Sequence, residues 1–142
     1  MEEFVRFSHS VGNNLNHIER CTKYRYKMFR KMKYKAICMH AVRNAAERHG
    51  ITILELAVQD DHVHVIAQLP PTMSQSEAAQ LLKGGSAREI FLLAPQFKLR
   101  YPRGHLWARV NFKETVGRIT LDTARNYVRN QDEIHNSLFA LT

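Results

Sequence analysis

The sequence predicts an α+β fold: a ferredoxin-like or RRM-like antiparallel sheet with helices packed on one face and one additional C-terminal helix. Three observations favour it. The 142 residues suffice for one domain and are too few for two, so we expect a single domain over 1–142 with its core at about 15–131. A helical pattern leads directly into two strand-like segments that form a hairpin. A further helix, strand and helix follow, and the order β-α-β-β-α-β-α is that of a split βαβ sheet.

The first strand and the first helix are predicted from periodicity. Residues 17–27 are assigned to a strand, on a pattern in which alternation is mixed with charge. Residues 29–49 are assigned to a helix because apolar side chains recur at positions i, i+3, i+4 and i+7, which places them on one buried face. Gly50, a residue type that commonly ends helices, follows directly.

The next two segments predict a β-hairpin. Residues 51–58 are rich in β-branched side chains, and a short polar turn separates them from a second such segment at 62–69. Pro70 and Pro71 end the second strand, because proline lacks the N–H that a sheet requires. A sheet of this kind, with helices on one side, is expected to leave its other face open to nucleic acid or a partner subunit.

Two further helices are predicted between 74 and 94. Each begins with a capping-box pair, a serine and a glutamate three residues later: Ser74 with Glu77, and Ser86 with Glu89. Gly84 and Gly85 are expected to interrupt the helical segment between them. Residues 105–112 suit a strand, and a last helix is expected from Thr120 to about Gln131.

Charge and composition restrict the classes of function. Twenty-one Lys and Arg against 13 Asp and Glu give a net charge of +8 and a sequence pI of about 9.8. This balance favours a polyanionic partner, most simply nucleic acid. The hydrophobic content of 44 % supports a packed core, and no apolar run of membrane-spanning length or secretory leader is seen. We therefore expect a cytoplasmic protein, nucleoid-associated when bound to DNA, with no membrane partner.

Cysteine usage and loop motifs exclude several chemistries. Cys21 and Cys38 form neither a disulfide framework nor a Cys-x-x-Cys metal motif. Neither the P-loop nor the Rossmann glycine spacing is present, so no nucleotide cofactor is expected. The order of Ser, His and Asp suggests no hydrolase triad.

The strand at 62–69 carries the clearest candidate site. Alternate side chains share a face, so Val63, Val65 and their apolar successors should pack on the helices while His62 and His64 point the other way. Two such imidazoles, about 7 Å apart at their Cα atoms, can reach one divalent ion. The same pattern is also that of the polar side of an amphipathic strand.

The predicted last helix offers a candidate nucleophile. Tyr127 and Gln131 lie one turn apart, and Arg125 and Arg129 form a second such pair. Cations favour a phenolate and stabilise charge on an attacked phosphate, so a tyrosine in this setting suits phosphoryl transfer. A half-buried tyrosine with its hydroxyl in water is the alternative.

Two basic segments are candidates for nucleic-acid contacts. The aromatic and basic run 23–27 suits stacking and clamping of a single strand, or is a solvated edge. Segment 83–88 suits a phosphate cradle, or is a turn between helices. The candidate DNA-binding cations are Lys23, Arg25, Lys83, Arg88, Arg125 and Arg129.

Together these segments resemble the single-tyrosine HUH transposases (TnpA type) of small bacterial and archaeal insertion sequences. The resemblance spans about 15–131 and rests on five ordered motifs: Cys21-Thr22-Lys23-Tyr24-Arg25, Asp61-His62-Val63-His64-Val65-Ile66, Leu82-Lys83-Gly84-Gly85-Ser86, Thr115-Val116-Gly117 and Tyr127-Val128-Arg129-Asn130-Gln131.

The resemblance implies a mechanism and partners. His62, His64 and Gln131 would hold Mg²⁺ or Mn²⁺, and Tyr127 would attack single-stranded DNA near a hairpin to give a 5′-phosphotyrosine link without ATP. It also implies a homodimer in which the tyrosine helix can complete the partner's site. The rival interpretations are a domesticated relative that cuts palindromes, a non-catalytic RRM-like binding module and a small dimerisation domain. The strand at 62–69 weakens the RRM-like alternative, because it lacks the aromatic pair that stacks bases.

Overall fold

The structure is a computed structural model that describes residues 15–115, with side chains described as far as Arg109. The elements in chain order are β1 (Leu15–Thr22), the 3₁₀ turn η2 (Lys23–Arg25), α2 (Met32–Arg48), β2 (Thr52–Val58), β3 (His62–Gln68), α3 (Gln75–Leu93), the 3₁₀ turn η3 (Pro95–Leu99) and β4 (Trp107–Thr115). The predicted last helix, with Tyr127, Gln131, Arg125 and Arg129, lies outside the described residues. Within 15–115, no helix is long and apolar enough to cross a membrane.

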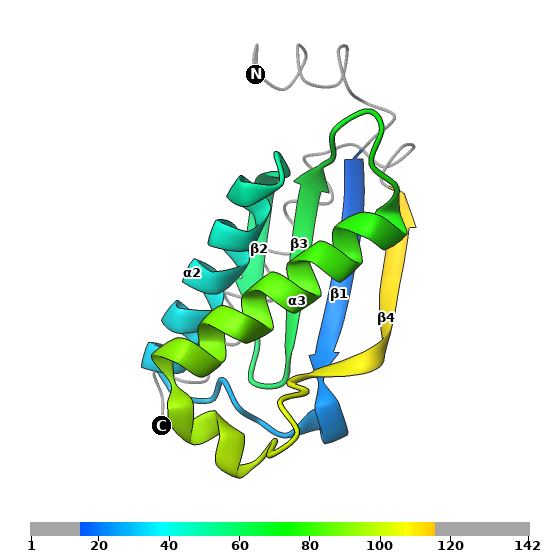
Figure 1. Cartoon of the computed structure of the whole chain (residues 1–142). Helices are drawn as coiled ribbons and strands as arrows, with labels where there is room; N and C mark the ends of the chain where they lie inside the picture. The colour runs from blue at the N-terminus through cyan, green and yellow to red at the C-terminus, as the bar shows by residue number, and fades with distance from the viewer. Residues whose placement is uncertain (1–14, 116–142) are drawn as a thin grey trace, which may run out of the picture.

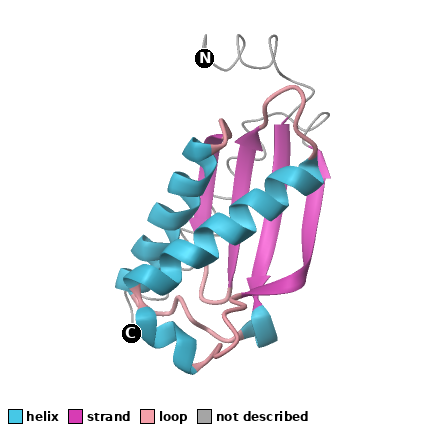
Figure 2. Ribbon diagram, viewed as in Figure 1, coloured by secondary structure: helices cyan, strands magenta, loops and turns pink. Residues whose placement is uncertain are grey.

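The described part is a two-layer α+β structure (Figure 1). Its four strands form one antiparallel sheet in the order β2-β3-β1-β4, so β1 and β3 are the central strands. Helices α2 and α3 both cover the same face of this sheet, as the secondary-structure colouring in Figure 2 makes plain. This arrangement confirms the predicted ferredoxin-like sheet with helices on one face.

The core lies between the helices and the sheet. On β3, Val63, Val65 and Ala67 are buried in it, which confirms the predicted apolar face of that strand. From α2 the core takes a stripe of small side chains at helical spacing: Cys38, Ala41, Val42, Ala45 and Ala46. Small residues let the helix lie close to its neighbours, which explains the pattern that predicted the helix.

The prediction of two helices between 74 and 94 is wrong, because α3 continues through Gly84 and Gly85. Gly85 is a packing residue rather than a break: a Cβ atom on it would lie 2.8 Å from the Cβ atom of Ala45 on α2. The first capping box is confirmed, since the backbone N–H of Glu77 donates to Oγ of Ser74 at 3.0 Å.

Ser86 is not a helix cap. It is buried in the middle of α3, where its Oγ accepts a hydrogen bond from the indole N–H of Trp107 at 3.0 Å. A buried indole N–H needs an acceptor, so the hydroxyl of this serine satisfies Trp107 on β4 and does not cap a helix. The phosphate cradle considered at 83–88 is also wrong, because the backbone there is α-helical and not a loop or a helix start.

The first strand ends earlier than predicted, at Thr22 rather than 27. The chain turns sharply there, because Tyr24 and Arg25 both adopt positive φ, at 63° and 53°. Oγ1 of Thr22 donates to the carbonyl of Tyr26 at 2.7 Å and closes this turn. This hydrogen bond joins residues that are close in sequence, but the alternation of polar and apolar residues in the segment does not indicate it. The strand was therefore predicted to be too long at this end.

The sheet face opposite the helices is not open along its whole length, contrary to the sequence-based expectation. His17 on β1 and His64 and Ile66 on β3 all point to that face, and each is buried.

Candidate functional site

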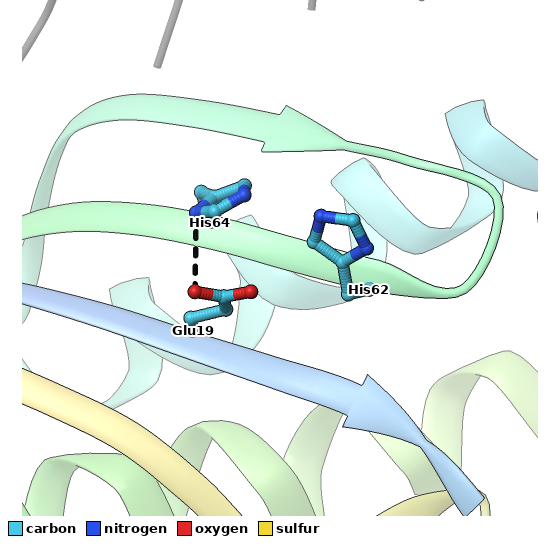
Figure 3. Close-up of side chains that lie close together, drawn as sticks. All are labelled: Glu19, His62 and His64. Atoms are coloured by element: carbon cyan, nitrogen blue, oxygen red, sulfur yellow. Dashed lines mark ion pairs between the residues drawn. The ribbon is translucent and has the colours of Figure 1, made fainter. Parts of the chain in front are cut away.

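Two central strands bring three ligand-type side chains together. His62 and His64 alternate along β3 and therefore share a face, as predicted, and Glu19 lies directly opposite His64 on β1. One ligand atom of each of the three lies within 4.8 Å of the others. Oε2 of Glu19 is 3.8 Å from Nδ1 of His64, and Figure 3 shows all three side chains at one place on the sheet.

Asp61 orients the first histidine. Its carboxylate oxygen lies 2.7 Å from Nδ1 of His62, in the turn that leads into β3. A carboxylate at this distance favours a proton on Nδ1 and leaves Nε2 of His62 free to act as a ligand. Asp61 is therefore placed to set the tautomer of His62, a candidate metal ligand.

His64 is held in its neutral form. It is 3 % exposed, its Nδ1 lies 3.1 Å from Nε2 of His17, and the two rings stack with centroids 5.3 Å apart. Burial, followed by the charges of His62 and His17, lowers the pKa of His64 to about 4. A neutral imidazole is the form that binds a metal, so His64 is ready to do so at neutral pH.

The donor set suits a divalent cation. Two imidazole nitrogens and one carboxylate oxygen form a mixed ligand set, of the kind that Mn²⁺ and other first-row ions accept. Mg²⁺ prefers oxygen ligands, of which Glu19 supplies one from the described residues. The residues therefore fit a metal, with Glu19 as a candidate ligand that the sequence prediction missed. Gln131, the third ligand implied by the resemblance, lies outside the described residues.

Local sequence contains no signal that would have identified Glu19. It lies more than 40 positions before His62, and only the antiparallel register of β1 and β3 brings them together. Asp61 directly precedes the two histidines in sequence, but the sequence pattern predicts no role for it. His17 was placed on the first strand without a function.

Two of the candidate DNA-binding cations, Lys23 and Lys83, interact electrostatically. Burial, followed by the charges of Arg20, Arg109 and Lys23, lowers the pKa of Lys83 on α3. Lys23 and Lys83 thus belong to a concentration of positive charge near the start of η2. Arg88 is exposed on α3, but five residues from Lys83 in a helix is about 140° around its axis, so the two point in different directions.

Arg25 is the last residue of η2. It is exposed, and its guanidinium donates to Sγ of Cys21 at 2.9 Å. Cys21 is the strand partner of His62, so Arg25 lies close to the end of the sheet that carries the histidines. Arg125 and Arg129 lie outside the described residues.

The fold and the site together define an α+β domain with an antiparallel sheet and a candidate metal centre on its two central strands. The family model of IS200-like transposases matches residues 10–131 of the chain and identifies its family. The chain belongs to this family of transposases, which are DNA-cutting enzymes, and the resemblance inferred from the motifs is confirmed.

Individual relatives agree with this family assignment. The chain is 30 % identical over 126 residues to the transposase of insertion sequence element IS200 from Salmonella typhimurium, covering 89 % of this chain and 82 % of that one. It is 27 % identical over 117 residues to the ISDra2 transposase TnpA of Deinococcus radiodurans, covering 82 % and 83 %.

Solved structures show the same fold. A crystal structure described as a transposase of Deinococcus radiodurans R1 superposes with a TM-score of 0.67 at 27 % identity, over 82 % of this chain and 89 % of that one. A REP-associated tyrosine transposase bound to a REP hairpin superposes with a TM-score of 0.54 at 15 % identity, over 82 % and 62 %. The second likeness is one of fold alone.

Proposed function

We propose that this chain cuts and rejoins single-stranded DNA at hairpin-marked ends of an insertion sequence, through a 5′-phosphotyrosine intermediate and without ATP. The observation that carries the proposal is the cluster of Glu19, His62 and His64 in a member of the IS200-like transposase family. A bound Mg²⁺ or Mn²⁺ would polarise the scissile phosphate there.

The residues have separate roles in this proposal. His62 and His64 hold the ion, and Glu19 or Gln131 provides a further oxygen ligand. Asp61 keeps His62 in the tautomer that binds, and the buried setting of His64 keeps that ring uncharged. The phenol of Tyr127 gives its proton to water, and its oxygen attacks the phosphorus. The 3′-oxygen of the preceding nucleotide is displaced and takes up a proton from water to become a free 3′-hydroxyl. The covalent bond retains the energy of the phosphodiester, which allows rejoining.

The DNA partner and the assembly belong to the same proposal. A relative of this fold was solved with a REP hairpin, which supports hairpin DNA as the ligand of this chain. Residues 1–142 would form one domain, and two copies would form a homodimer whose tyrosine helices can complete each other's sites. Arg125 and Arg129 would stabilise charge on the attacked phosphate.

Covalent trapping tests the chemistry. Labelled single-stranded oligonucleotides from the DNA flanking the gene are incubated with the protein and Mg²⁺ or Mn²⁺, and the products are separated on a denaturing gel. We expect a metal-dependent protein–DNA band with the wild type and none with Tyr127→Phe. His62→Ala and His64→Ala should remove most of the band. An undiminished band with Tyr127→Phe would refute the proposed nucleophile.

A further inference from the structure

An open pocket of about 500 Å³ lies beside the turn that follows β1. Its volume is in the range of about 300–1,000 Å³ that is typical of ligand sites. The walls come from two parts of the chain that are distant in sequence: the stretch that runs from Arg25 to Tyr34 at the start of α2, and Arg100 after η3. Figure 1 shows these segments together at the end of the molecule where β1 ends and β3 begins.

The pocket is strongly basic. Its charged lining residues are all cations, namely Arg25, Lys27, Arg30, Lys31 and Arg100, and none of the described residues that line it is acidic. All five are exposed. Five positive charges around one cavity repel each other, so the arrangement is unfavourable for the protein alone and favours an anionic ligand.

Aromatic rings accompany the cations. Tyr26 and Tyr34 line the pocket, and the guanidinium carbon of Arg100 lies 4.2 Å from the ring centroid of Tyr26. Beside them, the ring of Tyr24 is 67 % exposed and its centroid is 5.4 Å from that of Tyr26. Bases stack on tyrosine rings and on guanidinium planes, whereas a simple phosphate ion has no planar ring that could stack on either.

The backbone adopts an unfavourable conformation at the turn beside the pocket. Tyr24 and Arg25 are consecutive non-glycine residues at positive φ, a conformation that costs free energy and persists only where surrounding contacts enforce it. Here the enforcing contacts include the hydrogen bond from the hydroxyl of Tyr101 to the carbonyl of Lys23, at 2.8 Å. The turn places the exposed ring of Tyr24 and the side chain of Arg25 on the surface next to the pocket.

The pocket adjoins the candidate metal centre. Arg25 lines the pocket and also contacts Cys21, whose strand partner is His62. A strand of DNA with a phosphate at His62 would therefore have its neighbouring nucleotides at or near the basic pocket.

We infer that this pocket binds nucleotides of single-stranded DNA that adjoin the cleaved phosphate, with phosphates on Arg30 and its neighbouring cations and a base on Tyr24. The inference rests on the proposed function in its choice of DNA as the ligand. It adds a site that lies apart from Glu19, His62 and His64 and that works without a metal.

Salt dependence of binding tests the cationic part. The probe is a fluorescein-labelled oligothymidine longer than the roughly 16 nucleotides that such sites cover, titrated in EDTA so that no cleavage occurs. Each phosphate contact to a single strand contributes about 0.7 to the slope of log affinity against log salt concentration. Arg30→Ala should weaken binding and reduce the slope by about 0.7. Arg43→Ala, which removes another exposed arginine from the middle of α2, is the matched control and should leave the slope unchanged.

A probe without bases tests the aromatic part. Tyr24→Asn removes the ring and suits the positive φ of this position, so the fold should be retained, as circular dichroism can verify. Loss of one stacked base should reduce affinity for oligothymidine by about 5- to 160-fold. Binding of an abasic oligomer of equal length should be unchanged.

The outcomes separate this inference from the proposed catalysis. Equal salt slopes for wild type, Arg30→Ala and Arg43→Ala would overturn it, as would equal losses on both probes with Tyr24→Asn. Tighter binding of a duplex of the same length, with the same dependence on Arg30, would overturn the assignment to single strands. Pocket-dependent binding without any covalent adduct at element ends would support the pocket and refute the catalytic proposal instead.

Discussion

The carboxylate of Asp61 lies 2.7 Å from Nδ1 of His62, while the neighbouring Asp60 binds the ammonium of Lys35 at 2.9 Å. Two consecutive aspartates in one turn thus face different partners. Lys35 is buried on α2, so the pair it forms with Asp60 ties that helix to the β2–β3 turn. Asp61 acts on the candidate metal centre and Asp60 on the fold.

Exchanging each aspartate for asparagine should separate these roles. Asp61→Asn keeps a hydrogen-bond acceptor but removes the carboxylate that fixes the orientation of the His62 ring, so affinity for Mn²⁺ should fall about 10- to 100-fold. Isothermal titration calorimetry measures this change. Asp60→Asn should leave metal affinity near the wild-type value and lower the free energy of unfolding, because a buried lysine loses its charged partner. Equal metal affinity for Asp61→Asn and wild type would argue against its orienting role.

Glu19 provides a second test of the metal centre. If its carboxylate is a ligand, Glu19→Gln should lower Mn²⁺ affinity by at least about tenfold, because a neutral amide is a much weaker ligand than a carboxylate. Glu47→Gln, an exposed carboxylate on α2, is the matched control. A loss of affinity in Gln131→Ala combined with full affinity in Glu19→Gln would show that Gln131 is the oxygen ligand and that Glu19 is not.

Substitution by alanine should change the free energy of unfolding in opposite directions at Gly84 and at Gly85. A Cβ atom on Gly85 would collide with Ala45 of α2, whereas nothing lies within 4 Å of one on Gly84. Gly85→Ala should therefore lower the free energy of unfolding by about 1–3 kcal/mol, the usual cost of overpacking. Gly84→Ala should raise it by up to about 1 kcal/mol, since alanine favours a helix. Urea denaturation monitored by circular dichroism checks both. Equal effects of the two substitutions would contradict the helix contact.

These adjacent glycines also mark the limit of prediction from sequence. The β2–β3 hairpin and α2 were predicted because their periodicity reports burial directly. A glycine pair reads as a break when the helix that packs against it is unknown, and Ser86 reads as a cap when the indole of Trp107 is unknown. Both errors arise from tertiary contacts that override a local signal.

The candidate site likewise contains residues that local sequence predicts and residues that only the tertiary structure brings together. His62 and His64 are close in sequence, so strand alternation alone places them on one face. Glu19 joins them only through the register of β1 against β3, and the cations of the basic pocket come together only after Arg100 returns beside Tyr26. Lys23 to Lys27 were recognisable as basic and aromatic, but the cavity they border depends on the turn at Tyr24 and Arg25.

Tyr101 supports that turn, and its ionisation should be visible in the stability of the protein. It is 3 % exposed, and its hydroxyl donates to the carbonyl of Lys23. Tyr101→Phe leaves this carbonyl without that donor and should cost about 1–2 kcal/mol at neutral pH.

The pH dependence of this difference has a definite sign. Burial raises the pKa of Tyr101 from 10 to about 12, so between these values the unfolded chain releases a proton that the folded chain retains. The stabilisation is therefore complete below pH 10 and is lost as the pH rises toward 12, by at most about 1.4 kcal/mol per pH unit. The Phe variant lacks this loss, so the advantage of the wild type should shrink over this range and then reverse. Urea denaturation of both proteins at several pH values measures it, and a difference that stays constant from pH 8 to 11.5 would contradict the burial of the phenol.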